Sequence, residues 1–160
     1  EKEKNEETFV KKVVQTALEA ERQIRRQQVL HNTRMLMEEY IEMKRHIESA
    51  VSEEEELKEE QYDVFRGEGA HLGSVRRSKM KTAMMIANID RAMEELRAEY
   101  ETKEMAYKYD AFKMHYIDGV SYEEIADIQN CGKNTPSRWS KELIRKMSVK
   151  LFGIDGVEKY

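Results

Sequence analysis

Six basic side chains and one acidic side chain occupy residues 133–150 of a protein whose formal net charge is −4. The basic residues are Lys133, Arg138, Lys141, Arg145, Lys146 and Lys150, and the acid is Glu142. Lysine and arginine neutralise phosphates, and both can donate to the O6 and N7 atoms of guanine. Phosphate attraction depends on the local field more than on net charge, so this segment predicts a focused nucleic-acid contact.

Two short helices joined by a tight turn are predicted to carry this basic segment, over residues 121–146. Ser121 is a candidate N-cap, and Glu124 completes a capping box. Asn130-Cys131-Gly132 breaks the first helix, because Asn and Gly tolerate the left-handed conformation. Pro136 is tolerated only in a first turn, so the second helix is predicted to begin at an Asn134 cap. A basic second helix after a short acidic one is typical of a helix-turn-helix that enters the major groove.

Roles in DNA contact follow from the outward face of this helix-turn-helix. Base-edge contacts are predicted for Asn134, Ser137, Arg138 and Lys141. Phosphate contacts are predicted for Ser121, Tyr122, Lys133, Arg145 and Lys146. Trp139, Leu143 and Met147 recur at spacings of four, which predicts an apolar stripe with Trp139 in the core. The same geometry also serves plain protein–protein packing, but the acid-poor second helix favours DNA.

A long helix is predicted over residues 74–104, with Ser74 as its cap. Its seam, at spacings of three and four, consists of Ile86, Ile89, Met93, Leu96 and Tyr100. The first turns carry four cations that oppose the helix macrodipole, namely Arg76, Arg77, Lys79 and Lys81. Two interpretations stay open for them: an accessory basic patch for phosphate or an acidic protein surface, or a solvated face.

Residues 1–65 contain neither proline nor glycine and show helical periodicity. One apolar stripe comprises Val10, Val13, Ala17, Ala20 and Ile24, and a second comprises Leu36, Tyr40, Met43, Ile47 and Val51. An interruption is expected at His31-Asn32-Thr33. This region is predicted to be either a bundle helix or a dimerisation arm. Residues 66–73 hold three of the seven glycines and are predicted to be a linker, without the spacing of a phosphate-binding loop.

The composition, with 38% charged and 39% hydrophobic residues in 160, predicts an all-α protein: long N-terminal helices followed by a C-terminal helix-turn-helix domain at residues 105–160. A single Cys131 excludes a disulfide framework within the chain and indicates a reducing compartment. No histidine stands at metal-ligand spacing, so neither a metal nor a cofactor is expected. No apolar run is long enough to span a bilayer, which predicts a cytoplasmic protein. Without catalytic carboxylate, Cys–His or nucleotide-loop motifs, we do not expect an enzyme.

Residues 112–147 resemble the fourth conserved region of bacterial sigma factors. The matching pattern is Y-I-x-G-x-S-Y-E-E-I-A at 116–126, followed by the turn and Arg138-Trp139. A wider pattern is similar to the ArpU/RinA-type transcriptional regulators of phages and prophages. It comprises L-M-E-E-Y at 36–40, M-K-R-H-I-E at 43–48, T-A-M-M-I-A-N-I-D at 82–90 and L-F-G at 151–153, and it covers nearly the whole chain after the first two dozen residues.

This resemblance implies an activator of late phage genes that binds promoter double-stranded DNA and contacts RNA polymerase. A homodimer is the expected assembly, and no membrane partner is expected. The chain departs from the regulators that it resembles at Gly132, where they carry a Ser or Thr cap, and at Pro136, where they carry an apolar residue. Two alternatives stay open: a small-terminase-like adaptor for phage DNA packaging, which would form rings, and a sigma factor, which would need an aromatic-rich region to melt DNA.

Overall fold

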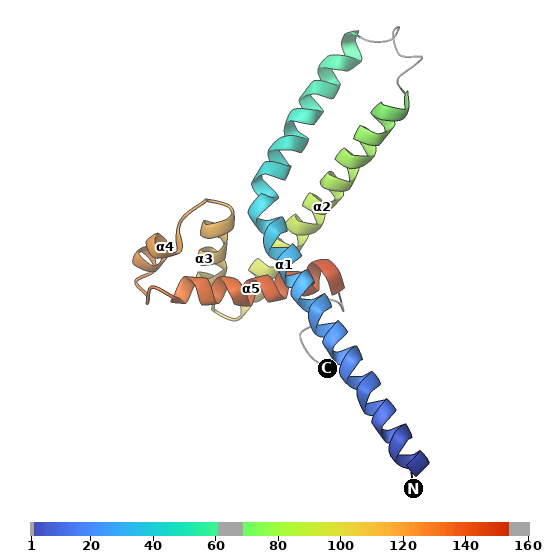
Figure 1. The fold of residues 1–160 in the computed structure, drawn as a ribbon. Helices are drawn as coiled ribbons and strands as arrows, with labels where there is room; N and C mark the ends of the chain where they lie inside the picture. Colours follow the sequence, from blue (N-terminus) through green and yellow to red (C-terminus); the bar gives the residue numbers. More distant parts are fainter. Residues whose placement is uncertain (1, 61–68, 154–160) are drawn as a thin grey trace.

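The computed structural model describes residues 2–60 and 69–153, with side chains described for 8–49 and 77–153. Every regular element in these ranges is a helix, which confirms the all-α prediction. The helices are α1 (Lys2–Glu60), α2 (Gly69–Thr102), α3 (Ala106–Tyr116), α4 (Tyr122–Ile128) and α5 (Thr135–Phe152). The middle of α1 crosses α5. The C-terminal half of α1 and the first half of α2 form a two-helix arm that projects from this crossing (Figure 1).

Helix α1 runs without a break for 59 residues, so the predicted interruption at His31-Asn32-Thr33 is wrong. Thr33 is fully buried, and its hydroxyl donates to the carbonyl oxygen of Val29 at 2.8 Å. The polar side chain is therefore satisfied inside the helix. Because no proline or glycine intervenes and Thr33 packs in the interior, nothing ends the helix there.

Helix α2 begins at Gly69, so residues 69–73 of the predicted linker are helical and Ser74 is not the N-cap. Glycine in a helix costs only about 0.5–1 kcal/mol relative to alanine, so Gly69 and Gly73 do not force an end. Residues 66–68 of that linker and residues 61–65 of the first predicted region lie outside the described residues, as do residues 154–160. At its other end α2 closes in a turn where Glu104 takes a positive φ of 57°.

One hydrophobic core lies where α1, α2, α3 and α5 meet. Its fully buried members include Met37 of α1, Ile89 and Leu96 of α2, Phe112 of α3, and Leu143 and Met147 of α5. All five residues of the predicted α2 seam are buried, which confirms that stripe. The second stripe of α1 packs against the same core through Leu36, Tyr40, Met43 and Ile47, as the bundle interpretation requires. The expected boundary at residue 105 is therefore a turn within one core.

Polar contacts fix the angle at which α5 crosses α2. Tyr100 of α2 donates its hydroxyl to Glu142 Oε1 of α5 at 2.7 Å, and Lys108 of α3 reaches Glu142 Oε2 at 2.8 Å. Lys146 Nζ of α5 lies 2.7 Å from Glu99 Oε1 of α2. Between α1 and α2, the hydroxyl of Tyr40 donates to Asp90. These contacts bridge helices far apart in the chain and orient the outer face of α5.

We expect the stabilising effect of Glu99 to depend on pH. Hydrogen bonds from Lys103 at 2.6 Å and Lys146 at 2.7 Å lower the pKa of the Glu99 carboxyl from 4.5 to about 2. Because the folded-state pKa lies below the unfolded value, the contribution is complete above about pH 4.5 and is lost as the pH falls toward 2. Glu99→Gln should therefore lower the melting temperature at neutral pH, and this deficit should shrink in acid.

Circular-dichroism melts across this pH range would measure that deficit. Glu101→Gln is the matched control, because Glu101 is half-exposed and, among the described residues, its carboxylate pairs with Arg97 of the same helix alone, at 3.3 Å. A Glu99→Gln deficit that stays constant down to pH 2 would contradict the assigned role.

Candidate nucleic-acid interface

The short helix α4 is held by the capping box that its sequence predicts. Ser121 Oγ accepts from the backbone N–H of Glu124 at 3.2 Å, and the backbone N–H of Ser121 donates to Glu124 Oε2 at 3.1 Å. The Ser121 hydroxyl also lies 2.8 Å from Glu124 Oε2. This hydroxyl takes part in the cap and so helps to position the start of α4, and its predicted phosphate contact stays a prediction. Ile125 and Ala126 are buried and anchor α4 to the rest of the fold.

The turn between α4 and α5 spans residues 129–134. Asn130 has a φ of 49°, which confirms the predicted left-handed residue, whereas Gly132 lies outside the left-handed region. The backbone N–H of Cys131 donates to Ala126 O at 2.9 Å, and that of Thr135 donates to Gly132 O at 2.8 Å. Gln129 Nε2 donates to Tyr107 O at 3.0 Å and so links the turn to α3.

Helix α5 begins where the sequence predicts, with Asn134 as the preceding residue and Pro136 in the first turn. The Asn134 side chain makes no cap hydrogen bond, so the start is confirmed but the side-chain cap is not. Proline at this point removes only a backbone N–H that has no partner within the helix. The exposed Asn134 amide is therefore left outside the hydrogen bonding of the helix end.

Three faces of α5 have distinct surroundings. The first packs into the core and consists of Pro136, Ser140, Leu143, Ile144, Met147 and Ser148, all buried. The second faces α2 and α3 and consists of three charged residues at spacings of four, Glu142, Lys146 and Lys150. The third consists of the exposed residues Asn134, Arg138, Lys141 and Arg145. We call this third set the outer face of α5, and Ser137 lies beside it, half-buried.

The six basic residues of the segment are divided between these surroundings. Lys146 pairs with Glu99 at 2.7 Å and Lys150 pairs with Glu95 at 3.3 Å, so both neutralise acids of α2. The predicted phosphate contact of Lys146 would therefore compete with its ion pair to Glu99. Lys133, in the turn, lies 2.7 Å from Glu123, but both side chains are largely exposed, at 75% and 69%. Such exposed pairs add little to stability, and the lysine can exchange its partner for another anion.

Arg138 and Lys141 carry the positive charge at the exposed start of the outer face. Within the described part of the chain neither side chain has an ion-pair partner, and both are exposed. They are three residues apart, so they lie on the same side of the helix. This start of α5 lies next to α4, at the end of α5 away from α1 (Figure 1).

Two aromatic side chains of the segment are held by ring contacts. Trp139 packs edge-on against Tyr107, with centroids 5.0 Å apart, and is half-buried, so it joins the edge of the fold but not the core centre. Tyr122, expected to contact phosphate, stacks on His115 at 3.8 Å and is also half-buried. His115 in turn has its Nδ1 3.0 Å from Val120 O. These contacts give both aromatic rings a structural role.

The accessory basic patch lies away from α5. Arg77 and Lys81 are exposed and Lys79 is half-buried, and the Arg76 side chain lies outside the described residues. At 1.5 Å per residue along α2, Lys81 of the patch is roughly 20 Å from Glu95, which pairs with α5. It belongs to the two-helix arm, in which the acid-rich end of α1 runs alongside (Figure 1). The structure therefore does not bring this patch together with the outer face of α5.

Glu95 and Glu99 were missed as positioning residues by sequence reasoning. They stand four apart on α2, and Lys146 and Lys150 stand four apart on α5. Matching spacings of opposite charge on two helices are the signal that could have paired them.

Comparison of the chain with protein-family models, with curated proteins and with solved structures gives no significant match. None of the helices in residues 2–60 and 69–153 combines the length and the apolar character that crossing a bilayer requires. Among the described residues, no cluster of three or more His, Cys, Asp or Glu side chains is placed to hold a metal ion. Function is therefore inferred from the geometry of α4, the turn and α5.

Proposed function

We propose that this protein is a sequence-specific regulator of transcription that binds double-stranded DNA through α4 and α5. In this proposal the two helices form a helix-turn-helix, and the start of α5 enters the major groove. The observation that carries the proposal is the division of charge on α5. Lys146 and Lys150 pair with acids of the same chain, whereas Arg138 and Lys141 stand exposed without ion-pair partners among the described residues.

The outer face supplies the side chains for base contacts. Arg138 and Lys141 can donate to guanine, and the Asn134 amide can both donate and accept, which suits adenine. Ser137 lies beside them, half-buried, and its shorter side chain is proposed to contact a base edge as well. Lys133 and Arg145 flank this set along the chain and are proposed to bind phosphates, which would fix the register of the helix on the duplex. Lys146 holds α5 against α2 and so sets the angle of this face.

The regulated genes and the partner follow from the resemblance described above. It supports an activator of late phage or prophage genes that works at promoter DNA together with RNA polymerase, inside the bacterial host cell. A ring-forming DNA-packaging adaptor is the second candidate. The exposed apolar side chains of the N-terminal third of α1 favour it because they offer a surface through which copies of the chain can associate. Particle mass separates the two: a monomer or dimer supports regulation, whereas a closed ring of many copies supports packaging.

Salt-dependent binding tests the proposal. We expect the protein to bind random-sequence duplex DNA in fluorescence anisotropy, with log K falling linearly with log salt concentration and a slope of about −0.9 for each phosphate neutralised. Arg145→Ala should reduce this slope by about one and weaken all sequences alike. Absence of binding at low salt would contradict a role in DNA recognition.

A further inference from the structure

The N-terminal third of α1 exposes an unusual amount of apolar surface. Phe9 is 68% exposed and Ile24 is 59% exposed, and Val10, Val13, Val14 and Leu18 are each about half-exposed. This part of α1 projects away from the core (Figure 1), whose first α1 member is Val29. Large apolar side chains gathered along one segment mark an interaction surface.

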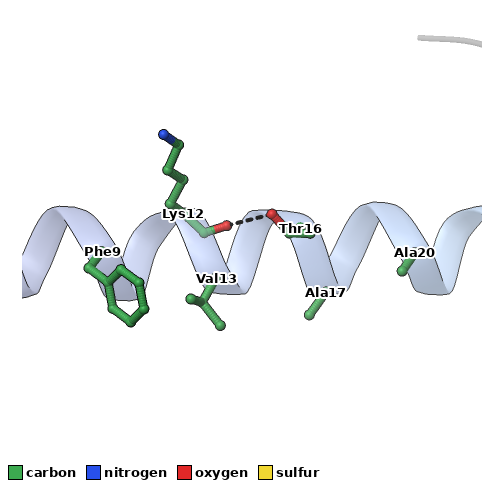
Figure 2. A pocket seen from close by; sticks show the side chains of 6 residues that line it. All are labelled: Phe9, Lys12, Val13, Thr16, Ala17 and Ala20. Carbon is green, nitrogen blue, oxygen red and sulfur yellow. Dashed lines mark hydrogen bonds between the residues drawn. The ribbon is translucent and has the colours of Figure 1, made fainter.

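One side of this segment forms a shallow open groove along a single helix. It is lined by Phe9, Lys12, Val13, Thr16, Ala17 and Ala20, and Figure 2 shows Phe9, Val13 and Ala17 projecting from the same side. Phe9, Val13, Thr16 and Ala20 recur at four, three and four, the spacing of a coiled-coil seam. The Thr16 hydroxyl donates to Lys12 O at 2.9 Å, so this polar side chain is already satisfied within the seam.

We propose that this seam pairs with the same seam of a second copy of the chain, in the antiparallel direction. In that direction Phe9 of one copy lies opposite Ala20 of the other, and Val13 lies opposite Thr16. The Phe9–Ala20 layer then sets a large side chain against a small one, and the Val13–Thr16 layer pairs two side chains of nearly equal size, which fills space evenly. In a parallel pair each residue would meet itself, so the two Phe9 rings would crowd at one end and the two Ala20 methyls would leave a gap.

The charges beside the seam specify the same direction. Lys12 and Glu19 flank the seam on one side, both are exposed, and neither has an ion-pair partner among the described residues. In the antiparallel pair Lys12 of each copy lies beside Glu19 of the other, so two-fold symmetry forms the pair twice. In a parallel pair the neighbours across the seam would be Ala17 for Lys12 and Ile24 for Glu19, and no ion pair would form. The seam is thus self-complementary in one direction only.

The dimer has a consequence for DNA that depends on the proposed function. Its two-fold axis passes between Val14 and Gln15, and the core begins at Val29 in each copy. At 1.5 Å per residue the two cores are held roughly 40 Å apart. The two α5 helices would then read half-sites separated by more than one turn of DNA, which is about 34–36 Å.

Charge-exchange variants and cross-linking test the pairing in the absence of DNA. Failure of the dimer proposal can therefore be distinguished from failure of the DNA-binding proposal. We expect analytical ultracentrifugation of the full chain to show a dimer. Lys12→Glu alone and Glu19→Lys alone should each weaken it on the order of tenfold, and the double variant should restore it. A monomer at all concentrations, or no change in either single variant, would overturn the proposal.

Disulfide cross-linking measures whether the two seams pair parallel or antiparallel. It is carried out in a Cys131→Ser background, because Cys131 is the one cysteine of the sequence. Antiparallel pairing predicts that a Phe9→Cys chain cross-links to an Ala20→Cys chain when the two are mixed. An Ala20→Cys chain that cross-links to itself, with no mixed product, would show a parallel pair and overturn the assigned direction. Circular dichroism of each variant confirms that the helices are retained.

Discussion

Phe112→Ala is expected to destabilise the fold by about 3–5 kcal/mol, because it empties the centre of the shared core. The Phe112 side chain of α3 is fully buried in the core that α3 shares with α2 and α5. Its ring contacts Tyr116 at a centroid distance of 4.8 Å. Because domains are stable by only about 5–15 kcal/mol, the variant should be close to unfolding at room temperature.

Urea unfolding followed by circular dichroism measures this loss. Met80→Ala is the matched control, since Met80 is 67% exposed on α2 and its truncation should change the free energy of unfolding by less than about 0.5 kcal/mol. A loss below about 1 kcal/mol for Phe112→Ala would mean that α3 does not pack as described.

Arg138→Ala is expected to cost about 1–3 kcal/mol of specific DNA binding and to relax the preference at one base position. The side chain is exposed at the start of α5 and lacks an ion pair among the described residues, so its removal leaves the fold unchanged. The effect should therefore appear in affinity and sequence preference but not in the melting temperature.

Arg91→Ala supplies the matched comparison for that variant. It removes the same charge from α2, where Arg91 is 71% exposed and lies 3.9 Å from Glu95. Both variants would be titrated against the same duplex at the same salt concentration, because electrostatic affinity varies steeply with salt. Equal binding by Arg138→Ala and the wild type would exclude Arg138 from base recognition.

Local signals in the sequence predicted the local structure well. The Ser121 capping box, the left-handed Asn130 and the start of α5 after Asn134 are all confirmed, because each depends on residues within a few positions. The periodic seam of α2 is confirmed for the same reason. The errors at Thr33 and at residues 69–73 came from reading tolerated residues as helix breaks.

Contacts between distant helices could not be predicted in this way. Lys146 stands in the same basic run as Arg138 and Lys141, but only the crossing of α5 over α2 brings it to Glu99. Likewise, the apolar stripes along α1 could not show that Met37 and Tyr40 enter the core while Phe9 stays exposed. Those outcomes depend on where the helices cross, which is a property of the whole fold.

Selection of bound sequences from a pool of random duplex DNA tests the central claim most directly. The bound DNA would be sequenced after several rounds with the wild type and with Arg138→Ala in parallel. We predict one enriched motif that contains a guanine, and loss of the preference at one of its positions in the variant. Recovery of DNA without any enriched motif, or the same motif from both proteins, would contradict base reading by the outer face of α5.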